Sequence, residues 1–342
     1  RYWGRTDAHP RLAERTAFHM DSDWEIPRDL QPDPAEHDFD VDAALRSVVG
    51  VKALVPADGF TAQTLGTERT GSGVVIRPDG LIATIGYLVT EAETIWLTTH
   101  DGRAIPGHAL AYDFETGFGL IQALGRLNLP ALALEDGPLP RPGDVCILAS
   151  AGGRKHAVRC TVAARQEFAG YWEYMLEEAI FTAPAHPSWG GAGLLGGEGK
   201  LLGVGSLIMQ QQDSKGRRID LNMVVPSSLL PPILDDMLAY GRPNKPARPW
   251  LGLYAAEDDR GVVVNSLARN GPAERAGIEE GDRVAAVEGV RIAYVPGLWR
   301  AIWGSGAAGT KVRLTIARER GKREVTIPSI DRRSFLKAPR LH

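Results

Sequence analysis

The sequence has few cysteines, no long apolar run and no strong excess of charge. Its two cysteines, Cys146 and Cys160, are too few for a disulfide-rich scaffold and do not form a CxxC pair. A formal net charge of -3 over 342 residues gives no electrostatic reason to expect a nucleic-acid partner. No run approaches the roughly 18 apolar residues that span a bilayer, and residues 1–30 contain no apolar core of a secretory signal. We therefore expect no nucleic acid and no integral membrane segment.

The composition is that of an ordinary globular chain with more than one compact unit. Hydrophobic residues make up 44% and charged residues 24% of the 342 residues, as in typical folded domains. A chain of this length exceeds the size at which one hydrophobic core keeps growing, so we expect two or three units. Residues 1–40 are rich in charge and proline. We expect an extended or partly disordered N-terminal arm there.

Short β-branched runs separated by glycine and proline fill residues 41 to about 226. Many short runs at this spacing predict an all-β barrel or sandwich. The strand candidates are residues 47–55, 72–90, 94–110, 144–152, 157–165, 200–209 and 221–226.

Residues 227–249 contain a helix pattern followed by a linker. Apolar residues recur at helical spacing, at Leu229, Leu230, Ile233, Leu234, Met237 and Leu238. Gly241 and three prolines follow and predict the end of the helix. We therefore place a β domain at 41–240 and a linker at 241–248. Strand patterns around two predicted helices, near 271–278 and 297–306, then indicate a small α+β module.

The C-terminal module carries a specific motif. Residues 271–292 read GPAERAGIEEGDRVAAVEGVRI, after PWLGL and before KVRLTIARERGK. This pattern resembles the PDZ domain of the HtrA (Deg) family of serine proteases over residues 249–328, which leaves 329–342 as a tail. The resemblance implies that backbone N–H groups of one loop hold the terminal carboxylate of a partner. That loop consists of Trp250, Leu251, Gly252 and Leu253. The alternative is a packing module that binds nothing.

The upstream domain resembles the protease domain of the same family. The resemblance is carried by TGSGVVIRPDGLIATIGYLVT, ETGFGLIQAL, RPGDVCILASAGG and HPSWGGAGLL. It implies a mainly β fold, a chymotrypsin-like double β-barrel. In this family a histidine, oriented by an aspartate, deprotonates a serine, and neighbouring N–H groups stabilise the oxyanion.

The chain departs from the family pattern at all three catalytic positions. Tyr87 stands in place of the histidine, Gly117 in place of the aspartate and Gly190 in place of the serine. Glycine has no nucleophilic atom, and a tyrosine with a pKa of about 10 is a poor base near neutral pH. We therefore predict a pseudoprotease in which Ser188 and Trp189 belong to the oxyanion loop.

Two alternatives for this site stay open. Ser188 and His186 lie in one loop and could form a rearranged nucleophile–base pair, or they could be ordinary turn residues. Aromatic residues at or near the former cleft could fill it or stack on a ligand. These are Tyr87, Trp189, Tyr171 and Trp172. His100 and His108 have no second ligand at metal-binding spacing, so we expect no metal and no cofactor.

Three functions follow as hypotheses. The first is a binding or scaffolding protein whose PDZ module captures protein C-termini or unfolded polypeptide segments. The second is an active serine endopeptidase with Ser188 as nucleophile. The third is a regulatory subunit that co-assembles with an active relative, because the resemblance implies association into trimers, for which residues 60–69 could serve as a contact. A homo-oligomer, a trimer, is the related expectation for the chain alone. The resemblance implies the periplasm or cell envelope, and the cytoplasm stays open as the alternative.

The two cysteines lie at equal distances from Gly153 along the chain. A hairpin turning at Gly152 and Gly153 would place Cys146 opposite Cys160, either as two buried thiols or as a cross-strand disulfide.

Overall fold

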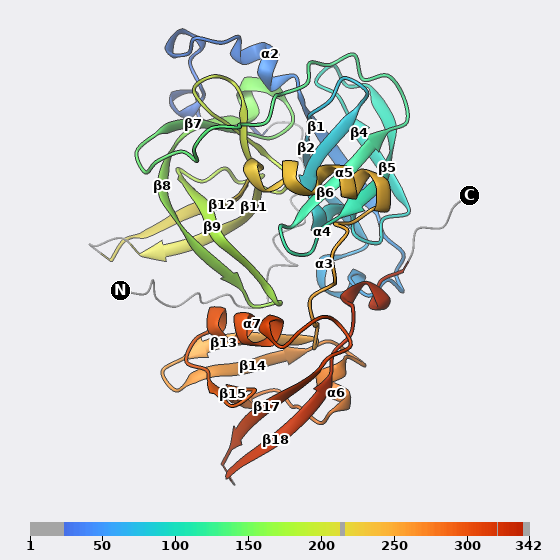
Figure 1. The fold of residues 1–342 in the computed structure, drawn as a ribbon. Coiled ribbons are helices and arrows are strands. Elements are labelled where there is room, and N and C mark those ends of the chain that lie inside the picture. The colour runs from blue at the N-terminus through green and yellow to red at the C-terminus, as the bar shows by residue number, and fades with distance from the viewer. Residues whose placement is uncertain (1–23, 213–215, 320, 338–342) are drawn as a thin grey trace. The chain divides into compact units, whose positions relative to one another are not determined.

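The structure is a computed structural model that describes residues 24–212, 216–319 and 321–337. The chain divides into two compact units, whose elements are labelled in Figure 1. The barrel unit comprises residues 24–166, Glu178–Asn244 and Lys337. The C-terminal unit comprises Lys245–Leu336 together with Glu167–Glu177. The segment Glu167–Glu177 thus belongs to a different unit from the residues that flank it in sequence.

Six antiparallel strands close the first barrel in the order β1-β2-β3-β6-β5-β4. They are β1 (Val48–Leu54), β2 (Glu68–Val75), β3 (Leu81–Ile85), β4 (Thr94–Thr98), β5 (Ala104–Tyr112) and β6 (Phe118–Ala123). Along β4 exposed residues alternate with buried ones, and the inward Ile95 and Leu97 are 2% and 0% exposed. This period of two fills a barrel interior. The short helices of this region are α2 (Val41–Leu45), α3 (Ala62–Leu65) and α4 (Gly86–Val89).

A second closed barrel has the order β10-β11-β12-β9-β8-β7. Its strands are β7 (Val145–Ala149), β8 (Ala157–Gly170), β9 (Tyr174–Ala183), β10 (Gly193–Leu195), β11 (Leu201–Gln212) and β12 (Arg218–Pro226). The 3-10 turn η3 (Gly153–His156) joins β7 to β8. The predicted mainly β fold with two barrels is therefore confirmed.

The hairpin of β7 and β8 pairs Cys146 with Cys160, as its predicted turn required. Both cysteines are buried free thiols. Burial raises the pKa of each thiol to about 12, so both remain protonated near neutral pH and unreactive.

The predicted helix before the linker is α5 (Pro231–Tyr240), preceded by the 3-10 turn η4 (Ser227–Leu229). Gly241 ends it in the left-handed conformation, with φ of +68° and its N–H bonded to the carbonyl of Met237.

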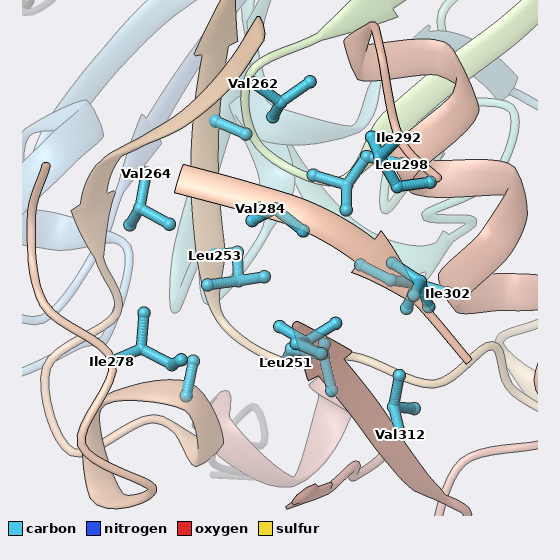
Figure 2. Close-up of a cluster of buried hydrophobic side chains, with 14 of the residues drawn as sticks. Leu251, Leu253, Val262, Val264, Ile278, Val284, Ile292, Leu298, Ile302 and Val312 are labelled. Atoms are coloured by element: carbon cyan, nitrogen blue, oxygen red, sulfur yellow. The ribbon is translucent and has the colours of Figure 1, made fainter. Parts of the chain in front are cut away.

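The C-terminal unit is a sheet covered by helices. Its strand order is β13-β14-β15-β17-β18, with β16 paired to β15. The strands are β13 (Leu253–Asp258), β14 (Gly261–Leu267), β15 (Arg283–Val287), β16 (Val290–Arg291), β17 (Lys311–Arg318) and β18 (Gly321–Pro328). The helices are α6 (Pro272–Arg275) and α7 (Val295–Gly304), where two helices were predicted. Figure 2 shows Leu253 of β13, Val264 of β14, Val284 of β15 and Ile302 of α7 meeting in one apolar core.

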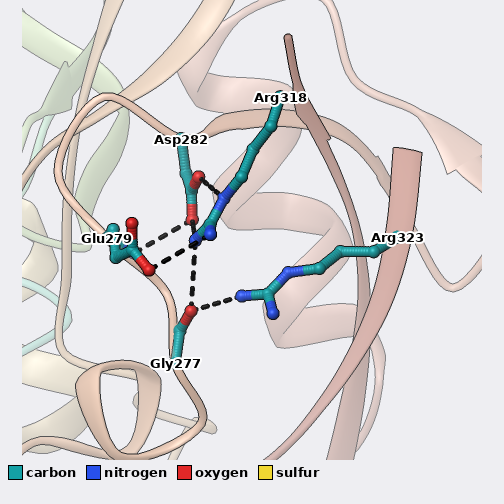
Figure 3. A network of polar contacts seen from close by, with 5 residues as sticks. All are labelled: Gly277, Glu279, Asp282, Arg318 and Arg323. Carbon is teal, nitrogen blue, oxygen red and sulfur yellow. Dashed lines mark hydrogen bonds and ion pairs between the residues drawn. The ribbon is translucent and has the colours of Figure 1, made fainter. Parts of the chain in front are cut away.

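A polar network ties β17 to the loop before β15 (Figure 3). The Arg318 guanidinium bonds both carboxylate oxygens of Asp282, one at 2.7 Å, and approaches Glu279 to 3.1 Å. The carbonyl of Gly277 accepts bonds from Arg318, at 3.2 Å, and from Arg323. The Asp282 side chain is only 3% exposed, so its charge depends on Arg318 for compensation.

The structure describes parts of the expected N-terminal arm and C-terminal tail. Residues 1–23 of the expected arm lie outside the described residues. From residue 24 on, the chain packs on the second barrel, because Ile26 is 4% exposed and donates its N–H to the carbonyl of Lys155 at 2.7 Å. The segment forms the 3-10 turns η1 (Arg28–Leu30) and η2 (Pro34–Glu36). In the expected tail, the 3-10 turn η5 (Arg332–Phe335) belongs to the C-terminal unit.

Candidate functional site

Two of the three positions predicted to correspond to a catalytic triad lie next to each other. Tyr87 lies in α4 directly after β3, and its hydroxyl donates to the carbonyl of Ser206 at 2.8 Å. A Cβ atom built on Gly190 would lie 2.9 Å from that hydroxyl oxygen. Burial raises the pKa of the Tyr87 phenol above its ordinary value, against a weaker effect of a hydrogen bond with Trp189. The tyrosine is therefore a neutral group beside a residue that has no side chain.

The third position, Gly117, lies beside the first residue of α4. The carbonyl of Gly117 accepts the N–H of Gly86 at 2.7 Å, and its own N–H donates to Asp113 at 2.9 Å. Gly117 has φ of +85°, in the left-handed region that favours glycine. The ring of Tyr112 fills the space next to Gly86, where an added Cβ atom would lie 2.0 Å from the ring. No carboxylate is present at this position to orient a base.

The loop that carries Gly190 is fixed by backbone hydrogen bonds. The carbonyl of Gly190 accepts the N–H of Ser72 at 2.8 Å. The N–H of Ser188 donates to Nδ1 of His186 at 3.0 Å. An N–H that points at a histidine ring is already bonded, so the amide of Ser188 is not free to stabilise an oxyanion in this arrangement.

His186 is a buried structural residue. Its Nε2 lies 2.9 Å from the carbonyl of His156, and Nδ1 accepts the Ser188 N–H, which assigns the proton to Nε2. Asn222 bonds both the N–H and the carbonyl of His186, at 2.6 and 3.1 Å. Burial lowers the pKa of His186 to about 4. Both ring nitrogens are thus engaged, and neither is bonded to the Ser188 hydroxyl.

The four aromatic residues that the sequence placed near the former cleft fall into two groups. Tyr87 and Trp189 lie in the barrel unit, where Trp189 is buried, with 8% of its surface exposed. Tyr171 and Trp172 belong to the C-terminal unit, with their ring centroids 4.9 Å apart. Whether all four line one cleft stays a prediction.

The predicted carboxylate-binding loop does hold a carboxylate. The N–H groups of Gly252 and Leu253 donate to Oε1 of Glu173 at 2.8 and 2.9 Å, and the N–H of Leu251 reaches both oxygens at 3.2 and 3.3 Å. Gly252 has φ of +77°, and an added Cβ atom would lie 2.9 Å from the Cβ of Ala268. Glycine is therefore required for the three N–H groups to converge.

Trp250, the fourth predicted residue of this loop, has a structural role. It is 5% exposed, and its ring packs edge-on against Phe335 with centroids 5.0 Å apart. Its N–H and carbonyl both bond to Ile330. Trp250 thus fixes the carboxylate-binding loop through its contacts with Phe335 and Ile330.

Glu173 is the residue of this site that the sequence did not predict. No motif contains it, and it lies 78 residues before Leu251 in the chain. In the sequence Glu173 stands between aromatic residues in YWEYM. This pattern does not by itself predict that the glutamate binds a loop. His100 and His108 remain without a metal-binding partner set: in the part of the chain that the structure describes, no three His, Cys, Asp or Glu side chains group as metal ligands would.

Residues 71–204 match the trypsin-like peptidase domain family, and residues 249–328 match the PDZ domain family. The fold and domain order are those of HtrA/DegP-type trypsin-like proteases. Among solved structures, a serine endoprotease from Yersinia pestis has a TM-score of 0.51 at 20% identity, over 85% of this chain and 96% of that one. The HtrA-type protease AlgW with a decapeptide has a TM-score of 0.52 at 20% identity, over 88% and 98%.

Curated HtrA-type relatives are similar over most of this chain. A probable periplasmic DegP-like serine endoprotease of Chlamydia muridarum is 26% identical over 266 residues, covering 73% of this chain and 51% of the relative. The periplasmic serine endoprotease DegP of Escherichia coli is 26% identical over 264 residues, covering 73% and 54%. The chain therefore spans about half the length of these relatives. No helix within the described residues is long and apolar enough to cross a membrane.

Proposed function

We propose that this chain is a catalytically inert HtrA-type homologue that binds peptides or protein C-termini through its PDZ domain, in a scaffolding or regulatory role. The observation that carries the proposal is the pair of Tyr87 and Gly190. Gly190, at the position predicted for the nucleophile, has no nucleophilic atom. A Cβ atom built on Gly190 would lie 2.9 Å from the hydroxyl oxygen of Tyr87. A neutral, buried phenol cannot take the part of a histidine base at neutral pH.

Loss of the nucleophile removes the acyl-enzyme route. Binding and oxyanion stabilisation alone retain a rate on the order of 10³ over the uncatalysed reaction, which is far below useful turnover. Even this residual rate requires N–H groups that are free to bond the oxyanion. The Ser188 N–H is not free, because it is bonded to Nδ1 of His186. The arrangement therefore supports binding rather than hydrolysis.

The second candidate is a serine endopeptidase that uses Ser188. His186 is the nearest base in sequence, but its Nδ1 accepts a backbone N–H and its Nε2 is bonded to a carbonyl. A working Ser188–His186 pair would require the His186 ring to leave its buried site. Asn222 fixes the backbone of His186 there through bonds to its N–H and its carbonyl. These contacts argue against the second candidate.

Cleavage of casein by the purified chain tests the two functions against each other. We expect no cleavage by the natural chain and none by a Ser188→Ala variant. Cleavage that the Ser188→Ala change abolishes would support the endopeptidase and contradict the proposal.

The PDZ loop supplies the binding half of the proposal. Three N–H groups converge on one carboxylate, which is the chemistry that recognises a chain end. Titration of a fluorescent peptide with a free C-terminus, with its C-terminal amide as the matched control, measures this recognition. Equal affinity for acid and amide would contradict carboxylate recognition. Association into a trimer stays a prediction, which the molar mass in solution tests.

A further inference from the structure

The segment that joins β8 to β9 lies along the free edge of the C-terminal sheet. Strand β13 is the last strand of that sheet, paired to β14 on one side. On its other side the N–H of Ala255 donates to the carbonyl of Tyr171 at 2.9 Å. A peptide that binds a PDZ domain adds to the sheet edge in this way, next to the carboxylate-binding loop. The backbone of the segment therefore takes the place of a ligand strand.

Glu173 supplies the carboxylate of this internal strand. Its side chain receives the N–H groups of Leu251, Gly252 and Leu253, and the residue is 7% exposed. Glu173 also has φ of +56°, an unusual conformation for a residue with a side chain. Strain of this kind persists where surrounding contacts hold the residue in place.

Contacts with α7 and the buried core hold both ends of the longer segment Glu167–Glu177. Nε1 of Trp299 donates to the carbonyl of Gly170 at 2.9 Å. Arg300 pairs with Glu167 and, at 2.6 Å, with Glu177. Met175 belongs to the buried cluster that contains Leu251, Leu253 and Trp299. The segment Glu167–Glu177 thus supplies three features of a bound peptide. These are the apolar side chain of Met175, the backbone bond of Tyr171 and the carboxylate of Glu173.

We infer that Glu173 and its flanking residues are a built-in ligand that occupies the carboxylate-binding loop, so that a partner's C-terminus must displace Glu173 before it binds. This inference rests on the proposed PDZ function. The apparent affinity of a partner falls in proportion to the fraction of molecules whose loop is free. A loop that is free in about one molecule in a hundred weakens the apparent affinity about 100-fold. Any event that releases Glu173 from the loop would then increase the affinity for a partner's C-terminus.

The test compares two variants of the full chain with the natural protein. Glu173→Gln is isosteric with the protonated side chain and should keep the contacts with the loop. Glu173→Asn shortens the side chain and keeps a residue that tolerates the left-handed conformation. Glu178→Gln is the matched control, because this neighbouring carboxylate pairs with Arg165 and makes no contact with the loop amides.

The first readout is the dissociation constant for fluorescein-labelled hexapeptides Gly-Ser-Gly-Ser-Ala-X, where X is Val, Leu or Phe with a free carboxylate. We expect Glu173→Asn to bind about tenfold or more tightly than the natural chain, Glu173→Gln to bind no more tightly than the natural chain, and Glu178→Gln to match it. If the natural chain and Glu173→Asn bind equally well, peptide binding stands and the built-in ligand is refuted.

The second readout needs no peptide. Hydrogen exchange of the amides of Leu251, Gly252 and Leu253 should be faster in Glu173→Asn than in the natural chain, with other amides of the unit unchanged as evidence of folding. If no protein binds any peptide, the proposed PDZ function fails, and exchange alone decides the inference. Faster exchange in Glu173→Asn supports the internal contact, and unchanged exchange overturns it.

Discussion

Peptide binding should strengthen as the pH rises from about 5 to about 8, because binding displaces Glu173. Burial raises the pKa of Glu173 from 4.5 to about 7, against the lowering effects of the Leu253 N–H and of the charge on Arg332. Tyr254 in β13 interacts with Glu173, and Tyr171, two residues before Glu173, packs against Tyr254. Burial raises the pKa of both phenols, so both stay neutral in this window.

The sign follows from the difference in proton affinity between the two states. The inserted carboxylate binds a proton more tightly than the displaced one, whose pKa returns to its ordinary 4.5. Low pH therefore stabilises the inserted state, and this stabilisation is lost as the pH rises through about 7. With these two pKa values the apparent affinity changes roughly 70-fold between pH 5 and pH 8. The C-terminus of the free peptide, with a pKa of about 3.5, is ionised throughout this window.

Fluorescence anisotropy from pH 5 to pH 8 with one hexapeptide measures this dependence. The natural chain should bind progressively more tightly, and Glu173→Gln should lose most of the pH dependence while Glu178→Gln retains it. Calorimetry in two buffers of different ionisation enthalpy should show a proton released on binding near pH 6. A flat profile in the natural chain, or an equal slope in Glu173→Gln, would refute the reasoning.

Three further changes have expected outcomes. Arg318→Met should lower the free energy of unfolding, because it removes the side chain that bonds both carboxylate oxygens of the buried Asp282. In urea unfolding the loss should shrink as the pH falls and Asp282 takes up a proton. Gly252→Ala should abolish carboxylate selectivity and cost about 1–2 kcal/mol of unfolding free energy, because φ is +77° there; unchanged discrimination between peptide acid and amide would contradict this. Tyr87→Phe should cost about 1–2 kcal/mol by leaving the carbonyl of Ser206 without its bond, and an unchanged thermal midpoint would show that the bond contributes nothing.

The domain order could be predicted because its signals are local. The alternation of exposed and buried residues along β4 and the Gly241 stop after α5 each depend on a few neighbouring residues. The converging N–H groups around Gly252 were likewise predictable, since a glycine in that loop motif permits the close approach. The pairing of Cys146 with Cys160 followed from the position of one turn.

The contacts that decide the chemistry could not be predicted, because they join distant parts of the chain. Glu173 meets the loop at Gly252 across 79 residues, and its turn carries no composition that marks it as a ligand. The engagement of His186 by His156 and Asn222 spans 30 and 36 residues. The same sequence pattern, a histidine two residues from a serine, would suit an active dyad equally well.

The most direct test of catalytic inertness is the intact mass of the folded chain after incubation with a fluorophosphonate, with trypsin as the positive control. An inert homologue with glycine at position 190 should gain no mass under conditions that label trypsin completely. An adduct that maps to Ser188 and forms only in the folded protein would show an activated nucleophile and contradict the proposed function.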